Sequence, residues 1–361
     1  MKITDVRAHL LAIPTEEKDF PARWSWLNFN QIIVVVQTDE GITGYGEAFG
    51  YGVPQATASV INQVLNPMLV GSDPTQIAAL SDRMFRQTHL YGRYGITTFA
   101  ISGVDIALWD ILGKCAGLPL YRLLGGAQAS QVPSYASLVR YKDQGEIRAA
   151  ASHAKRSGYK AIKLHQVDVE SLKTVRETVG EEIRLMIDAN CPWNPEQALD
   201  LALRFKPYGI SWLEEPIWPP EDFRSLARLG HLCGIPIAAG ENACTVFQFR
   251  EMLEAGAAAY IQPSVIKVGG VSEWRKVAAH SEPYNVEIAP HSPYFGPGFL
   301  ATAHLVASFP SARSLEYLYV TLASSVFKQP LKFENGYFQL PQGPGLGLDI
   351  DLDFIKRYEV S

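Results

Sequence analysis

The chain has 361 residues, a formal net charge of −5 at pH 7, 47% hydrophobic residues and 19% charged residues. This length exceeds that of one small domain and suits a barrel with an additional domain, and the composition is that of an ordinary globular protein. The slight negative charge excludes a broad basic surface for nucleic acid or an anionic membrane, so we expect neither as a partner.

The N-terminal segment lacks the basic start and the long apolar core of a signal peptide. The densest apolar run, IIVVVQ at residues 32–37, is too short to span a membrane and predicts a buried strand. Four cysteines, Cys115, Cys191, Cys233 and Cys244, lie without CxxC spacing, which indicates reduced thiols. We therefore expect a cytoplasmic protein.

The first third of the chain predicts strands followed by helices. Residues 1–60 carry β-branched runs that a turn at residues 39–41 divides, whereas residues 55–118 show helical spacing of apolar positions. This order favours an α+β domain, which we place at residues 1–125. The tail is rich in turn residues and then extended, so we expect residues 320–361 to pack back on this domain and complete it.

From residue 126 to residue 319 the pattern changes to strict alternation of strand-like and helix-like segments. About eight such units follow one another with short connections, which predicts a (β/α)₈ barrel. A doubly wound sheet is the alternative. It gives no reason for polar residues at the end of nearly every strand, and no glycine-rich phosphate loop follows the first strand.

Three carboxylates stand at the ends of three successive predicted strands. Asp188 closes RLMIDAN, Glu214 closes ISWLEEP and Glu241 closes IPIAAGEN. In a parallel barrel these ends meet at one mouth, where clustered acids repel one another and require a cation. Three oxygen ligands around one point are typical of Mg²⁺. Glu215 follows Glu214 directly and points to the other side of the strand, and spacing alone does not decide between them.

Four further residues at strand ends suit proton transfer near these acids. Lys163 and His165 face the same side of one strand, where a lysine can polarise a substrate carboxylate and a histidine can remove a proton. His291, on the seventh strand, is an acid or base for the opposite face of a substrate, or a histidine that only hydrogen-bonds. Glu316, on the eighth strand, can donate a hydrogen bond to a developing oxyanion if burial raises its pKa.

The loop at residues 15–30, with residues 49–54, predicts a lid over the barrel mouth. Its rings can stack on a sugar or on an aromatic substrate, or can only exclude water, and its cations can pair with a distal carboxylate. We favour a sugar acid. Candidate substrate contacts are Lys18, Phe20, Arg23, Trp24 and Trp26 in the lid, with Asn190 and Ser264 at strand ends. Lys267 falls on the opposite strand phase from Ser264, so we expect it outside the cavity.

Taken together, these motifs resemble the enolase superfamily, mandelate racemase subgroup, over essentially the whole chain. The motifs are SGVDIALWDILGK (102–114), K-x-H (163–165), MIDAN (186–190), LEEP (213–216), AGEN (239–242), QPSVIKVGG (262–270), PHS (290–292), LEY (315–317) and GPGLGLDID (343–351). The resemblance implies an N-terminal α+β capping domain and a modified (β/α)₇β TIM barrel. It also implies one Mg²⁺ per active site, bound by Asp188, Glu214 and Glu241, which decides the LEEP ambiguity in favour of Glu214.

By the same resemblance, the shared reaction removes the proton α to a carboxylate and stabilises an enediolate. Lys163 resembles the lysine that neutralises the substrate carboxylate, and His165 stands at the base position of the second strand. His291 stands at the position of the base on the opposite face, and Glu316 resembles the acid that hydrogen-bonds the intermediate. The expected partner is a small-molecule carboxylate substrate, and we expect a homo-oligomer.

Two departures from the subgroup pattern guide the choice of reaction. The usual second-strand pair is K-x-K, and here His165 takes the place of the second lysine. The usual sixth-strand Asp that pairs with the seventh-strand His is Ser264 here, which stabilises the imidazolium of His291 less. We therefore expect dehydration of an acid sugar (aldonate- or aldarate-like) to a 2-keto-3-deoxy product. The alternatives are racemisation or epimerisation, cycloisomerisation of a lactone or anhydro sugar, and a barrel that binds its ligand without turnover.

Overall fold

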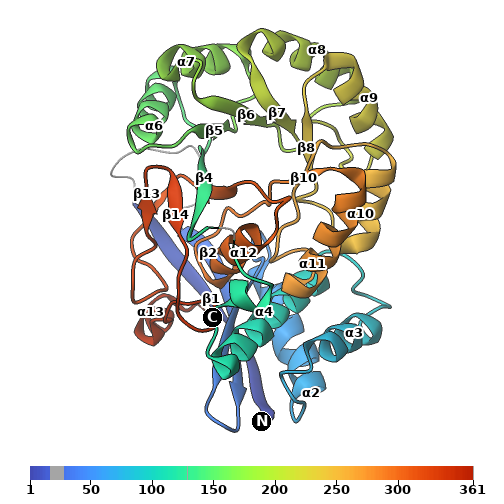
Figure 1. The fold of residues 1–361 in the computed structure, drawn as a ribbon, viewed down its shortest axis with the longest axis vertical. Helices are drawn as coiled ribbons and strands as arrows, with labels where there is room; N and C mark the ends of the chain where they lie inside the picture. Colours follow the sequence, from blue (N-terminus) through green and yellow to red (C-terminus); the bar gives the residue numbers. More distant parts are fainter. Residues whose placement is uncertain (17–27, 128, 361) are drawn as a thin grey trace.

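The computed structural model describes residues 1–16, 28–127 and 129–360. The N-terminal strands and helices form one end of the molecule, and a ring of strands surrounded by helices forms the other (Figure 1). The two parts meet at the middle of the molecule, so loops of one part reach the other.

A three-stranded antiparallel meander and a set of helices form the N-terminal part. The strands are β1 (Ile3–Glu16), β2 (Asn28–Thr38) and β3 (Thr43–Ala48). The helices are α1 (Pro54–Ser59), the π-helical η1 (Val60–Leu65), α2 (Asn66–Leu69), α3 (Ile77–Gln87), α4 (Ile96–Ala116) and α5 (Leu120–Leu123). Helix α4 packs closely on β3. The approach is so close that a Cβ atom on Gly46 would lie 1.9 Å from the carbonyl oxygen of Gly103. Glycine at this position permits that approach.

Within the described chain, α4 alone is long and apolar enough to cross a membrane by length and composition. Of its most apolar stretch, 83% is buried inside the protein. A buried helix that is apolar on all sides is expected at the centre of a large core, and α4 occupies that position here.

The C-terminal part confirms the expected modified TIM barrel. Its parallel strands are β4 (Gln131–Ser137), β5 (Ala161–Leu164), β6 (Arg184–Asp188), β7 (Ile210–Glu214), β8 (Ile237–Ala239), β9 (Tyr260–Ile261), β10 (Glu287–Ile288) and β11 (Leu315–Leu318). The helices between them are α6 (Gln144–Arg156), α7 (Val169–Val179), α8 (Pro195–Phe205), α9 (Phe223–Cys233), α10 (Thr245–Glu254), α11 (Gly270–Ser281) and α12 (Pro297–Ser308). Short 3₁₀ turns, η2 (Lys206–Tyr208) and η3 (Glu282–Tyr284), follow α8 and α11.

The ladder runs from β10 through β9, β8, β7, β6 and β5 to β4, and β11 pairs with β4. A single parallel bridge between Ile288 and Ala312 connects β10 to the chain just before β11. Inside this ring, Tyr135, Met186 and Trp212 pack together with small alanines. This filled layer is the floor on which the residues at the strand ends rest.

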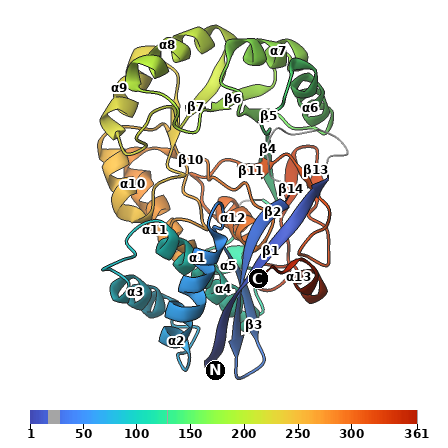
Figure 2. The same ribbon diagram turned by 180° about the vertical axis from the view of Figure 1, so that it is seen from behind.

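The last 40 or so residues contact both parts of the molecule. Strand β12 (Thr321–Leu322) pairs with β1, whereas β14 (Tyr337–Gln339) pairs with β13 (Phe333–Glu334) and with β4. Helix α13 (Leu352–Tyr358) lies beside β1, and Figure 2 shows this from behind. We propose the division into 1–125 with 320–361 and 126–319, with β14 attached to the barrel.

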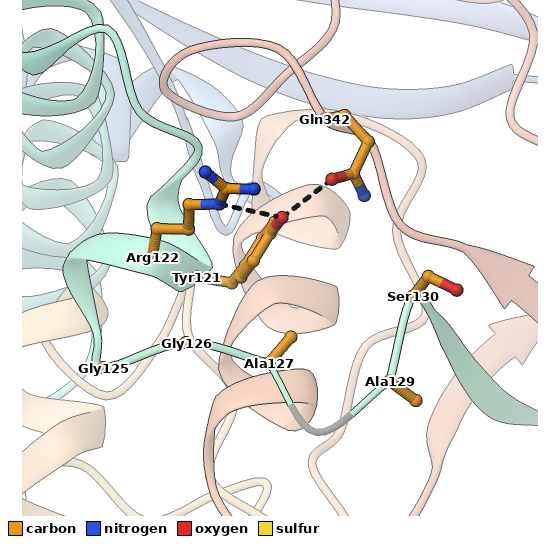
Figure 3. A pocket seen from close by; sticks show the side chains of 8 residues that line it. All are labelled: Tyr121, Arg122, Gly125, Gly126, Ala127, Ala129, Ser130 and Gln342. Atoms are coloured by element: carbon orange, nitrogen blue, oxygen red, sulfur yellow. Dashed lines mark hydrogen bonds between the residues drawn. The ribbon is translucent and has the colours of Figure 1, made fainter.

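A cavity of about 720 Å³ lies where the chain enters β4, at the opposite end of that strand from its carboxyl end. Figure 3 shows the Tyr121 hydroxyl between Arg122 and Gln342. The hydroxyl donates to Gln342 Oε1 at 2.7 Å and accepts from Arg122 Nε at 3.3 Å. These contacts fasten the connection between the two parts to the C-terminal segment.

Candidate active site

The three predicted acids come together at the carboxyl ends of the barrel strands. Asp188 and Glu214 are the last residues of β6 and β7, and Glu241 lies two residues past β8. One carboxylate oxygen from each acid lies within 4.8 Å of the others. Asp188 and Glu214 are fully buried, and Glu241 is partly exposed toward the mouth. The arrangement follows from the parallel ladder, which puts Asp188 directly opposite Glu214.

Lys163 extends from β5 into this group of acids and is buried. Its Nζ atom lies 2.7 Å from Glu214 Oε1, 2.8 Å from Glu316 Oε1 and 3.2 Å from Asp188 Oδ2. Burial alone would lower the pKa of Lys163, but the surrounding carboxylates raise it well above its usual value. The lysine is therefore a fixed positive charge inside the barrel mouth.

The structure separates the two glutamates of LEEP. Glu214 faces the acids and Lys163, and its second oxygen accepts a hydrogen bond from Trp212 Nε1 at 2.9 Å. Glu215 turns away, with a φ of 41°, and accepts from the backbone N–H of Gly240 at 2.9 Å. Burial raises the pKa of Glu215 to about 7. Glu214 is thus the member of the pair that the fold directs to the cluster.

His165 lies beside Asp188, just past the end of β5. Its Nε2 atom is 3.1 Å from Asp188 Oδ2, and its Nδ1 atom is 2.6 Å from the carbonyl oxygen of Leu138. Because a carbonyl can only accept, Nδ1 carries a proton and Nε2 is the nitrogen that faces the acids. Burial would raise the pKa of Asp188, but its interactions with Lys163 and His165 outweigh burial and hold that pKa far below the usual range.

His291 lies beside a different acid, with Nε2 at 3.2 Å from Glu241 Oε2. Burial lowers the pKa of His291, although Glu241 opposes that effect. Its Nδ1 atom is buried and has no hydrogen-bond partner among the described residues. Ser264 does not supply one, because its hydroxyl lies 3.5 Å from the Tyr294 hydroxyl instead. The histidine thus lacks a carboxylate that would stabilise its charged form through Nδ1.

Glu316 lies in β11 and contacts Lys163, and its Oε2 atom accepts from the backbone N–H of Ser292 at 3.0 Å. Burial would raise its pKa, but Lys163 outweighs burial and lowers it. The raised pKa that hydrogen-bond donation by Glu316 requires is therefore absent in this arrangement. The position of Glu316 in the sequence did not predict that the ammonium group of Lys163 would lie so close to it.

Three residues near the site were missed or misplaced by the sequence. Trp212 was missed, although it precedes Glu214 by two positions and therefore shares its strand face. Arg140 follows β4 and donates to the backbone oxygen of His165 at 3.0 Å and to Asn190 Oδ1 at 3.4 Å.

Lys267 does not join the acids. It is nevertheless buried at the mouth, with Nζ 3.5 Å from Asn242 Oδ1 and 4.8 Å from the ring centre of Phe49.

Lys267 was expected outside the cavity because side chains alternate along a strand. That expectation was wrong, because the strand ends before it reaches Lys267. Strand β9 ends at Ile261, and both Lys267 and Val268 donate backbone hydrogen bonds to the oxygen of Ser264, which closes a turn. Asn190 is exposed, and its own N–H donates to Asp188 Oδ1 at 3.0 Å. The predicted lid residues Lys18, Phe20, Arg23, Trp24 and Trp26 lie outside the described residues.

The donor set fits a hard divalent cation. Burial raises the pKa of Glu214 well above its usual value, and the negative charge of Asp188 adds to this effect despite the nearby Lys163. Three carboxylates so close together carry more negative charge than one ammonium group balances. Carboxylate oxygens without thiolate or imidazole ligands are the environment that Mg²⁺ prefers.

Comparison with known proteins agrees with this geometry. The family model described as "Enolase C-terminal domain-like" matches residues 146–354, and that of the "Mandelate racemase / muconate lactonizing enzyme, N-terminal domain" matches residues 21–125. The chain belongs to the mandelate racemase subgroup of the enolase superfamily. The structure thus confirms the resemblance seen in the sequence, including the capping domain and the barrel.

Members of this superfamily with dehydratase and cycloisomerase names are similar over nearly the whole chain. The arabinonate dehydratase of Saccharolobus solfataricus is 34% identical, with 90% of this chain and 89% of that protein covered. The D-galactarolactone cycloisomerase of Agrobacterium fabrum is 31% identical, with 100% and 99% covered. These relatives are lyases and isomerases, and the present chain is an enzyme of the same superfamily.

Solved structures show the same fold. The 3,6-anhydro-D-galactonate cycloisomerase of Zobellia galactanivorans superposes with a TM-score of 0.89 at 29% identity and covers 100% of both chains. A racemase of Streptomyces coelicolor with bound magnesium also gives a TM-score of 0.89 at 29% identity, with 99% of this chain and 100% of that chain covered. One structural relative therefore holds the ion that the three acids suit.

Proposed function

We propose that this enzyme dehydrates an acid sugar, aldonate- or aldarate-like, to a 2-keto-3-deoxy acid and uses one Mg²⁺ bound by Asp188, Glu214 and Glu241. The observation that carries the proposal is the placement of two histidines beside two different acids, His165 at Asp188 and His291 at Glu241. Such a pair can serve one substrate with a base and an acid. The named dehydratases among the relatives support this choice.

The bound ion would supply positive charge next to the substrate carboxylate and make the α-proton more acidic. Lys163 would add a second positive charge from β5, since its ammonium group is already fixed among the acids. Glu316, held by Lys163 and the N–H of Ser292, would line the side of the intermediate near β11. The ion and Lys163 would stabilise the negative charge that develops as the proton leaves, which is where stabilisation accelerates a reaction.

The proton transfers fall to the two histidines. Nε2 of His165 takes the α-proton, and the electron pair of that C–H bond moves toward the carboxylate. Nε2 of His291 then gives a proton to the β-hydroxyl, the C–O bond breaks and water leaves. The resulting enol takes up a proton at the β-carbon and loses the proton of its hydroxyl at the α-carbon, which gives the 2-keto-3-deoxy acid. His291 needs only to donate once in this sequence, so the missing carboxylate partner at Nδ1 is less damaging than it would be to a base.

Cycloisomerisation is the second candidate, because a named cycloisomerase matches the full length of this chain. It shares the removal of the α-proton by His165, and a ring oxygen leaves in place of water. Racemisation or epimerisation requires His291 to exchange protons with the α-carbon, which suits its unpartnered Nδ1 less well. We also propose a cytoplasmic homo-oligomer. The four cysteines, all of them free, support the compartment.

The test is a screen of acid sugars and their lactones with Mg²⁺ in deuterated water. Dehydration predicts keto-acid formation, while cycloisomerisation predicts a product with the composition of the substrate. Recovered substrate with an inverted, deuterium-labelled α-carbon and no keto acid would establish racemisation or epimerisation instead. If the chain binds an acid sugar but exchanges no α-proton, it is a binding protein and the proposal is wrong.

A further inference from the structure

A second cleft lies on the outside of the barrel, and none of the three acids lines it. Its volume is about 960 Å³, and it is enclosed by α3 and α4 of the N-terminal part and by α10 and α11 of the barrel. Side chains from all four helices and from the connection between α3 and α4 line it. None of the seven predicted metal and catalytic residues is among them. The cleft therefore needs an explanation separate from the chemistry at the barrel mouth.

The charge on its walls is positive. Four cations and two acids line the cleft, and both acids are already paired. Arg86 Nε lies 2.7 Å from Asp82 Oδ2, and Lys276 is paired with Glu273. The two remaining cations, Arg93 and Arg275, have no acidic partner among the described residues. Two guanidinium groups are therefore available for an anion.

Both of these arginines lie against aromatic rings. The guanidinium carbon of Arg93 is 5.9 Å from the ring centre of Phe247, and that of Arg275 is 5.2 Å from the ring centre of Trp109. Phe247 is about half exposed although it is a large apolar residue. Trp109 is buried, so the half-exposed ring of Phe247 is the one that offers a stacking surface for a flat ligand.

Two buried hydroxyl groups line the same cleft without a partner. Ser81 Oγ and Thr245 Oγ1 make no hydrogen bond within the described protein, and each residue is only 3% exposed. Buried polar groups are normally satisfied, so two orphaned hydroxyls in one cleft indicate a place for ligand oxygens. Thr245 also has a φ of 64°, which is unusual for a β-branched residue and marks strain at the start of α10.

From these features we propose that the cleft between α3, α4, α10 and α11 binds a phosphate monoester that carries an aromatic ring. Arg93 and Arg275 take the phosphate dianion, the exposed face of Phe247 takes the ring, and the hydroxyls of Ser81 and Thr245 bind the oxygens between them. A phosphate alone would use only the arginines, and a neutral nucleoside only the ring and the hydroxyls. The proposal does not depend on which reaction takes place at the barrel mouth.

The experiment is calorimetric titration of the full-length, Mg²⁺-loaded protein with AMP, inorganic phosphate and adenosine as separate probes. We expect saturable AMP binding, with phosphate and adenosine each at least about tenfold weaker, because each makes only part of the contacts. Arg93→Gln and Arg275→Gln should each weaken AMP binding at least about tenfold. Both side chains are exposed, so neither change threatens folding, and circular dichroism melts would check this.

The matched control is Arg148→Gln, which removes an exposed arginine from α6 on another side of the barrel and should leave AMP binding unchanged. The proposal is overturned if AMP fails to bind, if both cleft variants bind AMP as the wild type does, or if adenosine binds as tightly as AMP. Loss of AMP binding when EDTA removes Mg²⁺ would place the ligand at the three acids and would overturn it too. A failed screen for sugar acids, by contrast, has no bearing on it.

Discussion

Nδ1 of His165 lies 2.6 Å from the carbonyl oxygen of Leu138, just past the end of the neighbouring strand β4. This main-chain acceptor fixes which nitrogen of the imidazole carries its proton toward the barrel wall. The other nitrogen, Nε2, consequently faces Asp188 and the place where a substrate carboxylate would lie. A backbone carbonyl performs here the orienting role that a carboxylate side chain performs in many catalytic histidines.

Replacing His165 and replacing His291 should therefore have different effects on α-proton exchange. In His165→Asn we expect α-proton exchange and turnover both to fall by at least about a hundredfold, because no other base occupies the position of Nε2. In His291→Asn turnover should fall similarly while α-proton exchange persists. Proton NMR in deuterated water measures exchange, and a keto-acid assay measures turnover. Unchanged exchange in His165→Asn would show that His165 is not the base.

Trp212 should act on metal binding through Glu214. Its indole N–H holds the second carboxylate oxygen of Glu214 at 2.9 Å, so Trp212→Phe leaves that oxygen free to rotate. We expect Mg²⁺ affinity to fall by about ten- to a hundredfold, the usual effect of losing a partner that orients a ligand. Titration calorimetry measures this directly. Trp193→Phe is the matched control, since Trp193 is similarly buried but packs against Phe205.

The adjacent residues Glu214 and Glu215 allow a direct comparison of a proposed metal ligand with a neighbour that faces away from the metal site. Glu214→Gln should abolish detectable Mg²⁺ binding, because it removes one of three clustered carboxylates. Glu215→Gln should retain Mg²⁺ binding within about threefold, because Glu215 faces the N–H of Gly240 and an amide oxygen can still accept there. Equal loss in both variants would mean that the assignment of Glu214 is incorrect. Activity of the wild type should disappear with EDTA and return with Mg²⁺.

Glu47 should make stability depend on pH. This buried carboxylate in β3 accepts from Gln31 and from the N–H of Gly298 at the start of α12, and burial raises its pKa to about 7. The folded state thus holds the proton more tightly than the unfolded state, whose pKa is near 4.5. The stabilising contribution is complete below that value and is lost as the pH rises through about 7.

Replacement of Glu47 by Gln should remove this dependence while it keeps the acceptor oxygen. We expect the variant to gain stability relative to the wild type as the pH rises from about 5 to about 8, by an amount on the order of 3 kcal/mol. Urea unfolding followed by circular dichroism at several pH values gives the two curves. Parallel curves would show that the Glu47 carboxyl does not titrate in this range.

The strand ends of the barrel could be predicted because their signals are local. Alternating strand and helix patterns placed Asp188, Glu214 and Glu241 at one edge, and the parallel ladder brings them there. What spacing could not provide were contacts that depend on neighbouring strands, such as the ammonium group of Lys163 against Glu316. That contact reverses the expected direction of the Glu316 pKa shift.

The positions of Lys267 and Arg140 illustrate the same limit. Strand periodicity was extended past the end of β9, where the backbone already turns, so the side of Lys267 was misjudged. Its Nζ atom lies over the ring of Phe49, which is more than 200 residues away in sequence. Arg140 lies in the loop that follows the first barrel strand, and its contact with the backbone oxygen of His165 depends on a neighbouring strand.

The C-terminal segment has a consequence for the order in which the protein is made. All the residues proposed for metal binding and proton transfer precede residue 320, yet β12 and β14 add edges to β1 and β4 from beyond that point. A nascent chain that still lacks its last 40 or so residues leaves both sheets with an open edge. Both sheets can therefore be completed only after residues 320–339 have been made.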